Sequence, residues 1–463
     1  MDLNRIRQLL DRQPGVSAWQ LLHVAQDETT VIRLPLLFSP QLDVRNSSFV
    51  ISSNPHPREV ISTPSESVWV TLYCETSSDG KTRLGDALGQ LTNDREEDVK
   101  PVLSSLAAAA RAQRNQPFAL PDSKETYPDV ELSDPAIATL NQKELVEQAQ
   151  VFNERMLKAA AGLDHVDVSN LELFLRRYDR TFLSSSGISH AQRSTKVEAE
   201  ICFLARPDSA HAGEHTARVQ ARRISDLVPE QIAAEYGPAA RAIALAGPAR
   251  EFSGPVILEG EACADFLDLA KNPLSFHSSA RFVHEKASRY EPGKPVHEGQ
   301  LAGDPLDLVS DPLIAFGLRS APLDERDGTT CRRVSLARDG CFDELVGLRR
   351  YFAYLGLSRP SGAVGNTVIP AGKRPLSELA GGDCVVIKAF SDLHVDGASG
   401  EYAVEVRLGE RRKNGAAEPF KGGLFVGNWF RSIADARYSK ETRVRSGFYG
   451  PLAVRLGSAT LAA

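Results

Sequence analysis

The chain has 463 residues, of which 42% are hydrophobic and 25% are charged. Such a composition is typical of a soluble globular protein, and at ~100–200 residues per domain the length allows two to four domains. The net charge is −6, and the basic run Arg411–Lys413 spans only three residues, so we expect no nucleic-acid binding. No segment offers ~18 consecutive apolar residues, so we expect no membrane span.

Six cysteines are spread along the chain, and none of them forms a C-x-x-C pair. In a chain of this length they indicate reduced thiols, most of them in the core. The first residues are amphipathic and include the charged Asp2, Arg5 and Arg7, and no uninterrupted apolar run follows, so we expect no signal peptide. The expected location is therefore the cytoplasm.

The first 140 residues alternate helical and strand-like patterns. Apolar residues at helical spacing predict a helix that stops near Pro14, and Pro101 suits the first turn of a second helix that begins at Asp98. Residues 116–135 contain four prolines and predict an ordered surface connector. The predicted strands of this region are 18–24, 30–37, 49–53 and 68–73.

The clearest helix of the sequence starts at Asn141. Glu144 follows three residues later, as in a capping box, apolar residues then recur at helical spacing, and Gly162 is the expected stop. A meander of antiparallel strands is predicted next, over residues 166–175, 180–183 and 196–204. Residues 228–246 predict a helix that is interrupted at Gly237-Pro238.

The residues from 256 to 463 indicate short helices between strands. Residues 256–258 predict a short strand and residues 260–270 a helix, while Thr367–Ile369 is a β-branched run. Strict alternation from Tyr402 to Leu408 predicts a half-buried strand, and Asn414-Gly415 and Gly422-Gly423 supply turn positions that tolerate positive φ.

Four blocks in this part occur in a characteristic order: GNTVIPAG, PLSELAGG, DLHVDGASGEYAVEVRLGE and KGGLFVGNWFRSI. This order resembles the C-terminal region of the TldD/PmbA (TldE) family, which contains metallopeptidases and their peptidase-like partners. The resemblance extends over residues 140–460 and is loose before them. A family phrase, S-x-P-x-D-x-x-G, is met by Ser320, Pro322 and Asp324, although Gly328 comes one residue late.

The resemblance implies an α+β fold in two parts. Residues 1–225 would form an N-terminal sheet-and-helix domain, and residues 226–463 a larger, mostly antiparallel β domain of the TldD/PmbA type. The curved sheet of the second domain would enclose a tunnel for a peptide.

Active members of the family carry H-E-x-x-x-H on a helix that corresponds to about residues 260–290, and a late cysteine completes their zinc site. This sequence has no such motif: His284-Glu285 leads to Arg289 in the second histidine position, and His297-Glu298 leads to Ala302. The slot of the late cysteine reads VRSGFYGPLAVRLG, residues 444–457. We therefore expect no catalytic residue and no metal in this chain, with His277, His284 and His297 as a weaker alternative set of ligands.

Candidate contacts to a substrate follow from the resemblance and from residue type. His394 and Asp396 lie in the block DLHVDGASGEY, next to the groove that would accept an extended peptide. A structural role, with His394 bonded into the turn at Asp396, is the alternative. Arg332, Arg333, Tyr351 and Tyr354 are further candidates for the lining of that groove, against a plain packing role.

The resemblance implies a function as the non-catalytic, TldE/PmbA-like subunit of a heterodimeric zinc metallopeptidase complex that processes peptides. A TldD-like partner with H-E-x-x-x-H would then hold the zinc, and this chain would hold no cofactor. Two alternatives stay open. The chain could be a stand-alone hydrolase or tailoring enzyme with a rebuilt site, or a homodimeric peptide-binding scaffold.

Overall fold

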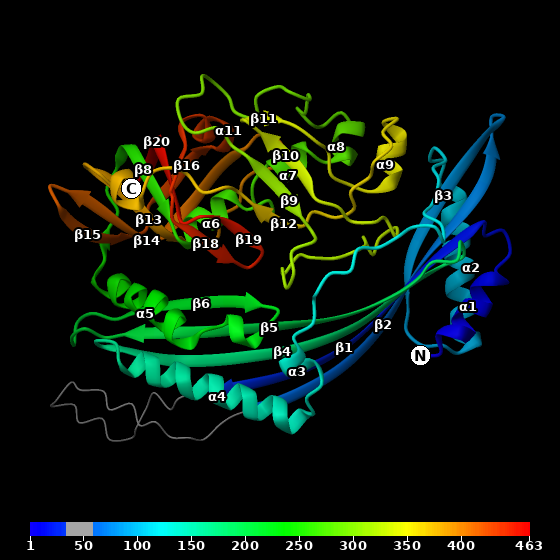
Figure 1. Ribbon diagram of the computed structural model, residues 1–463, viewed down its shortest axis with the longest axis horizontal. Coiled ribbons are helices and arrows are strands. Elements are labelled where there is room, and N and C mark those ends of the chain that lie inside the picture. The colour runs from blue at the N-terminus through cyan, green and yellow to red at the C-terminus, as the bar shows by residue number, and fades with distance from the viewer. Residues whose placement is uncertain (34–58) are drawn as a thin grey trace.

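The computed structural model describes residues 1–33 and 59–463. The predicted strand 49–53 and the end of the predicted strand 30–37 lie outside these residues. Figure 1 shows two parts, a long curved sheet with its helices and a β-rich part above one edge of that sheet. The predicted α+β class is confirmed, with an N-terminal sheet domain and a larger β domain.

The N-terminal sheet has six antiparallel strands in the order β3-β2-β1-β4-β5-β6. Its strands are β1 (Ala18–Arg33), β2 (Glu59–Ser78), β3 (Lys81–Leu91), β4 (Val166–Ser184), β5 (Ser189–Ala205) and β6 (Gly213–Ala221). The separate segments predicted within 166–183 are one continuous strand, β4, and the serine-rich stretch that follows it forms the turn to β5.

Helices cover one face of this sheet. They are α1 (Leu3–Asp11), α2 (Glu96–Ala112), α3 (Pro135–Ala138), α4 (Gln142–Ala161) and α5 (Pro229–Leu245), with the short η1 (Ile224–Asp226) before α5. Leu21 packs with α1 and α2, and Val31 packs with α4. Both residues are odd-numbered on β1, so the two helical layers share a face. The opposite face carries charged side chains such as Arg176 and Glu198, which form an ion pair.

Helix α4 begins as predicted. The Asn141 side chain accepts the Glu144 N–H at 3.1 Å, and the Glu144 carboxylate accepts the Asn141 N–H at 2.8 Å. The predicted interruption of α5 at Gly237-Pro238 is wrong, because the helix continues to Leu245. A Cβ at Gly237 would lie 2.3 Å from the Leu163 side chain, so this glycine permits close packing rather than ending the helix.

The C-terminal part contains two sheets that are mostly antiparallel. The six-stranded sheet has the order β11-β10-β9-β12-β19-β18, and the longer path is β13-β8-β20-β16-β14-β15-β7, with β17 paired to β20. The strands of the first sheet are β9 (Leu308–Asp311), β10 (Val334–Arg338), β11 (Cys341–Phe342), β12 (Asn366–Val368), β18 (Thr442–Arg445) and β19 (Phe448–Pro451). The others are β7 (Gly247–Pro248), β8 (Phe252–Glu259), β13 (Cys384–Phe390), β14 (Glu401–Lys413), β15 (Ala416–Lys421), β16 (Leu424–Asn428), β17 (Arg437–Tyr438) and β20 (Ala453–Ala462).

An additional pairing of β13 with β14 closes β13, β8, β20, β16 and β14 into a ring. Its inner positions are filled by buried apolar side chains, among them Val256, Ile387, Val404, Phe425 and Leu456. The ring therefore encloses a packed core, and a bound peptide would have to run outside it.

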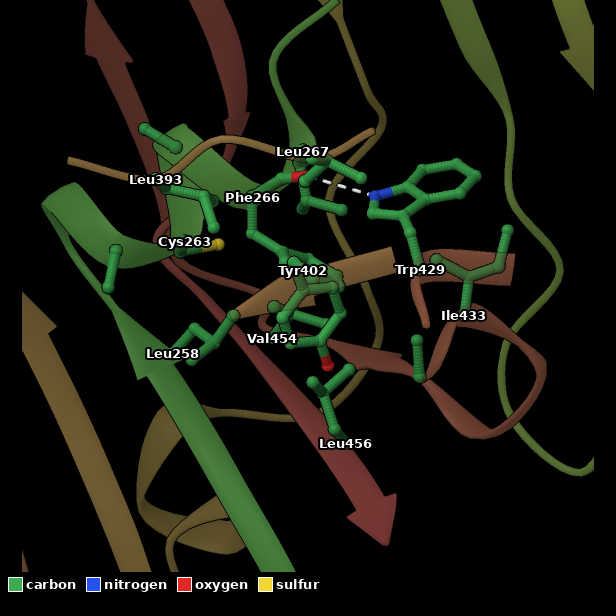
Figure 2. Close-up of a cluster of buried hydrophobic side chains, with 14 of the residues drawn as sticks. Leu258, Cys263, Phe266, Leu267, Leu393, Tyr402, Trp429, Ile433, Val454 and Leu456 are labelled. Atoms are coloured by element: carbon green, nitrogen blue, oxygen red, sulfur yellow. Dashed lines mark hydrogen bonds between the residues drawn. The ribbon is translucent and has the colours of Figure 1, made fainter. Parts of the chain in front are cut away.

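Helices of the C-terminal part are short. They are α6 (Glu261–Leu267), α7 (Leu274–His277), α8 (Ala280–His284), α9 (Arg349–Tyr354), α10 (Leu376–Leu379), α11 (Trp429–Ser432) and η2 (Ile433–Asp435). Figure 2 shows how α6 is seated: Phe266 and Leu267 enter the core, and the Trp429 indole N–H donates to the Phe266 carbonyl at 3.0 Å.

The two parts are joined by buried polar contacts. The Arg222 side chain, next to the end of β6, donates to the carbonyl oxygens of Gly317 at 2.8 Å, Ser320 at 3.0 Å and Leu318 at 3.2 Å. The division predicted at 225/226 stays a prediction. Helix α5, which follows it, packs on β5 and β6, and we propose to count it with the N-terminal sheet.

The cysteines are unpaired in the structure, as the sequence predicted, and Cys74, Cys263, Cys331 and Cys384 are buried. Within residues 1–33 and 59–463, no helix has the length and apolar character that crossing a membrane requires.

Candidate functional site

A mostly buried cluster of charged side chains is built on α6, in the region where the catalytic motif is expected. Gly260, with φ of 64°, turns the chain from β8 into this helix. Glu261 and Asp265 are four residues apart and lie on the same side of α6, whereas Cys263 and Phe266 face the core. The apolar residues thus anchor the helix, and its two carboxylates point away from the core.

Arg445 on β18 lies against both carboxylates. Its guanidinium donates to Glu261 Oε1, and its Nη1 is 3.6 Å from Asp265 Oδ1. Lys271 Nζ also lies 3.2 Å from Asp265. The Arg445 and Glu261 side chains are only 19% and 16% exposed, so the pair is shielded from screening by solvent. Burial still raises the pKa of Glu261, although Arg445 opposes the rise.

His215 on β6 completes this cluster from the N-terminal part. Its Nε2 is 3.8 Å from Glu261 Oε2, and its ring stacks on Tyr236 of α5 with 5.7 Å between centroids. Burial, with help from Arg407 and Arg445, lowers the pKa of His215 to about 4, so the imidazole is neutral at pH 7. Arg443 pairs with Glu235 at 2.5 Å and donates to the Tyr236 hydroxyl at 3.1 Å.

A cavity of about 610 Å³ lies beside the cluster, between the two parts of the molecule. The end of β6, from Val219 to Ala221, lines one side, and Arg443–Arg445 of β18 line the other. Both are terminal strands of their sheets. Two strand edges therefore border the same cavity, and α5 forms part of its wall.

The H-E-x-x-x-H spacing fits α6 only with Gly260 and Asp265 in the histidine positions and Glu261 in place of the glutamate. A zinc site needs imidazole, thiolate or carboxylate ligands that are free to coordinate. Here both carboxylates are engaged by Arg445, which itself belongs to the stretch 444–457 that the resemblance assigns to the late cysteine. Cys263 is buried, and its thiol is directed to the Pro451 carbonyl at 3.4 Å. The residues at this place do not fit zinc.

The three histidines of the alternative metal set have separate surroundings. His277 is 2% exposed; its Nδ1 accepts the Arg289 N–H at 3.1 Å and its Nε2 donates to the Ala398 carbonyl at 3.1 Å. Both ring nitrogens are thus occupied, and burial lowers the pKa of His277 to about 4.

His284 ends α8, and its ring lies 5.0 Å from that of Tyr354. His297 Nδ1 lies 3.1 Å from the Gly299 carbonyl oxygen. Among the described residues, no group of three or more His, Cys, Asp and Glu side chains is arranged to hold a metal ion.

His394 and Asp396 line an open groove of about 900 Å³, together with Glu401, Asn428 and Arg431. Asp396 Oδ1 accepts the N–H groups of Ser399 at 2.7 Å and Ala398 at 3.1 Å, which lowers the pKa of Asp396. The Asp396 carboxylate thus helps to hold this turn together. His394 is the histidine predicted to bond into this turn. In the structure it is His277 whose side chain bonds to the turn, at the Ala398 carbonyl.

The other four candidates lie elsewhere. The Arg332 guanidinium pairs with Glu344 at 2.8 Å, and Arg333 lies 3.7 Å from Asp311. Tyr351 and Tyr354 are on α9, and the Tyr354 hydroxyl donates to the Gln116 carbonyl at 2.8 Å. None of the four lines the groove of His394 and Asp396.

A comparison with protein-family profiles finds a match for the second part of the chain. Residues 252–463 match the profile described as "PmbA/TldA metallopeptidase C-terminal domain". The C-terminal domain belongs to the TldD/PmbA family. The resemblance carried by the four sequence blocks is thus confirmed for this domain.

Solved structures extend the likeness in fold over the whole chain. The chain resembles TldE from Thermococcus kodakarensis, with a TM-score of 0.74, 16% identity and 99% of each chain covered. It also resembles a proposed modulator of DNA gyrase from Bacteroides thetaiotaomicron, with a TM-score of 0.77 and 14% identity over 99% of this chain and 98% of that one. A similar protein from Thermotoga maritima gives a TM-score of 0.73 and 15% identity, with 99% of each chain covered. Comparison with curated proteins found no match.

Sequence reasoning missed the α6 cluster of this TldD/PmbA domain. The spacing of Glu261 and Asp265 was a local signal, because the motif can be laid over them with the glutamate in its place. Arg445 gave no such signal, since it is 184 residues from its partner Glu261. His215 comes from the other part of the chain and reaches the cluster only through the fold.

Proposed function

We propose that this chain is the non-catalytic, TldE/PmbA-like subunit of a heterodimeric metallopeptidase complex, and that a partner with H-E-x-x-x-H holds the zinc. The observation that supports the proposal is the Arg445 guanidinium between Glu261 and Asp265. A fixed internal cation occupies the carboxylates where a metal ion would be needed to activate water. The chain would then contribute shape and stability, and the chemistry would take place in the partner.

The cavity beside β6 and β18 supports a role in holding an extended peptide. A peptide in extended conformation can pair its backbone with an exposed strand edge, which gives affinity with little sequence dependence. Two edges border this cavity of about 610 Å³. The predicted groove candidates His394 and Asp396 line a different depression, and their contact with substrate stays a prediction.

Metal analysis of the purified chain tests the metal-free role. We expect no stoichiometric zinc after refolding in the presence of zinc and no peptide hydrolysis by the chain alone. Co-expression with a relative that carries H-E-x-x-x-H should give a stable complex with activity that is lost when the partner's glutamate is changed to glutamine. Zinc bound in equal amount by the isolated chain, and lost on substitution of His277 or His284, would sink the proposal.

The stand-alone enzyme is a second candidate because titratable groups converge at α6. Glu261 has a raised pKa and lies 3.8 Å from the His215 ring, beside a cavity of about 510 Å³. Peptide turnover by the purified chain alone, abolished by Glu261→Gln, would favour this candidate over the proposed subunit. A homodimeric scaffold would instead bind peptides as a dimer and would not co-purify with an H-E-x-x-x-H protein. The expected location for all three is the cytoplasm.

A further inference from the structure

A second cavity, of about 510 Å³, lies between α5, β13, β14 and the start of α6. In Figure 1, α5 lies between the N-terminal sheet and the strands β13 and β14. One part of the wall is apolar and is formed by Pro238, Ala239, Ala242, Ala389, Leu408 and Leu452. The rest of the wall is polar and includes His215, Glu259 and Glu261. The cavity therefore combines an apolar surface with a polar end that can form hydrogen bonds, as ligand sites commonly do.

His215 in this wall has a nitrogen without a partner. The residue is 3% exposed, and Nδ1 has no hydrogen-bond partner among the described residues. Nε2 faces the Glu261 carboxylate at 3.8 Å, so the proton of the neutral ring belongs on Nε2. Nδ1 is then a buried acceptor that lacks a donor, and such groups usually indicate a missing ligand or water.

Glu259 supplies a second acceptor in the same wall. Its Oε2 is buried without a hydrogen bond, and the nearest cation, Arg412, is 3.9 Å away. The other charged groups of the wall are already paired: Lys388 bonds to Glu410, and Arg443 pairs with Glu235. Among the described side chains of this wall, the buried polar atoms without a hydrogen bond are two acceptors, His215 Nδ1 and Glu259 Oε2, and one donor, Arg443 Nε. The two acceptors call for a ligand that donates.

We propose that this cavity binds a primary ammonium group that is attached to a short apolar body. The ammonium would donate to His215 Nδ1 and Glu259 Oε2, and the body would rest on Ala239, Ala242 and Leu408. An ammonium has three N–H donors and no acceptor, which suits two acceptors beside the Glu261 carboxylate. The group could belong to a free small amine or to the amino terminus of a peptide. The inference does not require a catalytic partner.

Calorimetric titration of the full chain tests the chemistry with three ligands of one carbon skeleton. Isoamylamine should bind at one site, whereas isoamyl alcohol and isovalerate should bind at least about tenfold more weakly, because a charged hydrogen bond contributes roughly 1.5–3 kcal/mol. A leucyl tripeptide and its amino-acetylated form then distinguish the two sources. Tighter binding of the free tripeptide assigns a peptide amino terminus, and binding of isoamylamine alone assigns a free amine.

Two variants locate the site. His215→Phe keeps the ring on Tyr236 but removes the acceptor, and Ala242→Leu fills the apolar part without changing a polar group. Each should weaken isoamylamine binding by about tenfold or more. His211→Phe is the matched control, because His211 is exposed before β6 and pairs with Asp208. Thermal unfolding of each variant shows that it is folded.

The proposal is overturned if neither isoamylamine nor the free leucyl tripeptide shows saturable binding. It is also overturned if isoamylamine, isoamyl alcohol and isovalerate bind equally well. So does unchanged binding in Ala242→Leu when that variant is folded, which keeps the test decisive if His215→Phe fails to fold. Zinc content and partner-dependent hydrolysis are separate readouts, so the metal-free role can stand or fall independently of the amine site.

Discussion

Arg445 is the residue that we expect to matter most for stability at the α6 cluster. Its guanidinium neutralises Glu261 and lies 3.6 Å from Asp265, and the side chains of the pair are mostly buried. Arg445→Met would leave two carboxylates in a poorly solvated place. The loss of a buried ion-pair partner commonly costs about 3 kcal/mol, and urea unfolding should show a loss of this size.

The control for this change is Arg431→Met, since Arg431 and Glu298 form a pair whose arginine is 76% exposed. Exposed pairs contribute about 0–1 kcal/mol, so this variant should unfold nearly as the parent does. Adding Glu261→Gln to Arg445→Met should recover part of the loss. A cost below about 1 kcal/mol for Arg445→Met would mean that water, rather than Arg445, solvates these carboxylates.

His277 predicts a pH dependence of stability. Its folded-state pKa is about 4, below the ordinary 6.5 of an unfolded histidine, because the ring is buried. The folded protein therefore binds fewer protons than the unfolded chain between these values, and stability is fully present above pH 6.5 and falls as the pH drops toward 4. His277→Gln, which retains a donor for the Ala398 carbonyl, should flatten the fall of the unfolding free energy between pH 7 and pH 5.

A slope in His277→Gln equal to that of the parent would contradict the buried neutral state of His277. His297→Gln serves as the comparison, because His297 is partly exposed and bonds only within its own loop. Comparison of the two variants at each pH then separates the effect of the buried ring from that of losing any one histidine.

At the scale of elements, the contact of β6 with α5 depends on Gly213. A Cβ there would lie 2.3 Å from the Ala244 nitrogen and 2.6 Å from the Ala240 carbonyl oxygen, both in the backbone of α5. Gly213→Ala would therefore push strand and helix apart, and overpacking of this kind costs about 1–3 kcal/mol. Chemical denaturation should show this loss in the free energy of unfolding. The cavity of about 510 Å³ that α5 and β6 border should change shape as well.

Gly247→Ala is the matched control for this contact. Nothing lies within 4 Å of a Cβ built at Gly247, which is on the short strand β7. A change there should stay within about 0.5 kcal/mol of the parent. Equal stability of the two alanine variants would show that α5 can shift without cost.

For the whole molecule, Arg222 joins the N-terminal sheet to the C-terminal domain. Its buried guanidinium donates to three carbonyl groups in residues 317–320 and to the Thr195 carbonyl at 3.3 Å. Arg222→Met would leave those carbonyls without donors, at about 1–3 kcal/mol for an unsatisfied buried group. Hydrogen exchange should therefore quicken in residues 313–320, whereas exchange in α2 should not change.

Arg193→Met provides the comparison, since the Arg193 side chain is 83% exposed and pairs with Asp179 on the surface of the same sheet. Exchange in residues 313–320 should match the parent in this variant. Equal exchange in Arg222→Met and Arg193→Met would mean that other contacts, such as the ion pair of Arg350 with Asp86, hold the two parts together.

Much of the local structure could be derived from neighbouring residues alone. The Asn141–Glu144 capping box starts α4, and Asn414-Gly415, with φ of 50° and 82°, forms the predicted turn between β14 and β15. The family blocks after residue 252 could also be recognised from the sequence, because each of them is a short continuous run of residues. These features depend on contacts within a few residues, where periodicity and backbone preference decide the outcome.

Only the tertiary structure decided what surrounds α6. Arg445 meets Glu261 across 184 residues, His215 arrives from the N-terminal sheet, and His277 rather than His394 bonds into the turn at Asp396. Closure of the ring by β13 and β14 likewise follows from a long-range pairing. Charge pairing and burial depend on distances in space, and a side chain's type and spacing along the chain do not specify them.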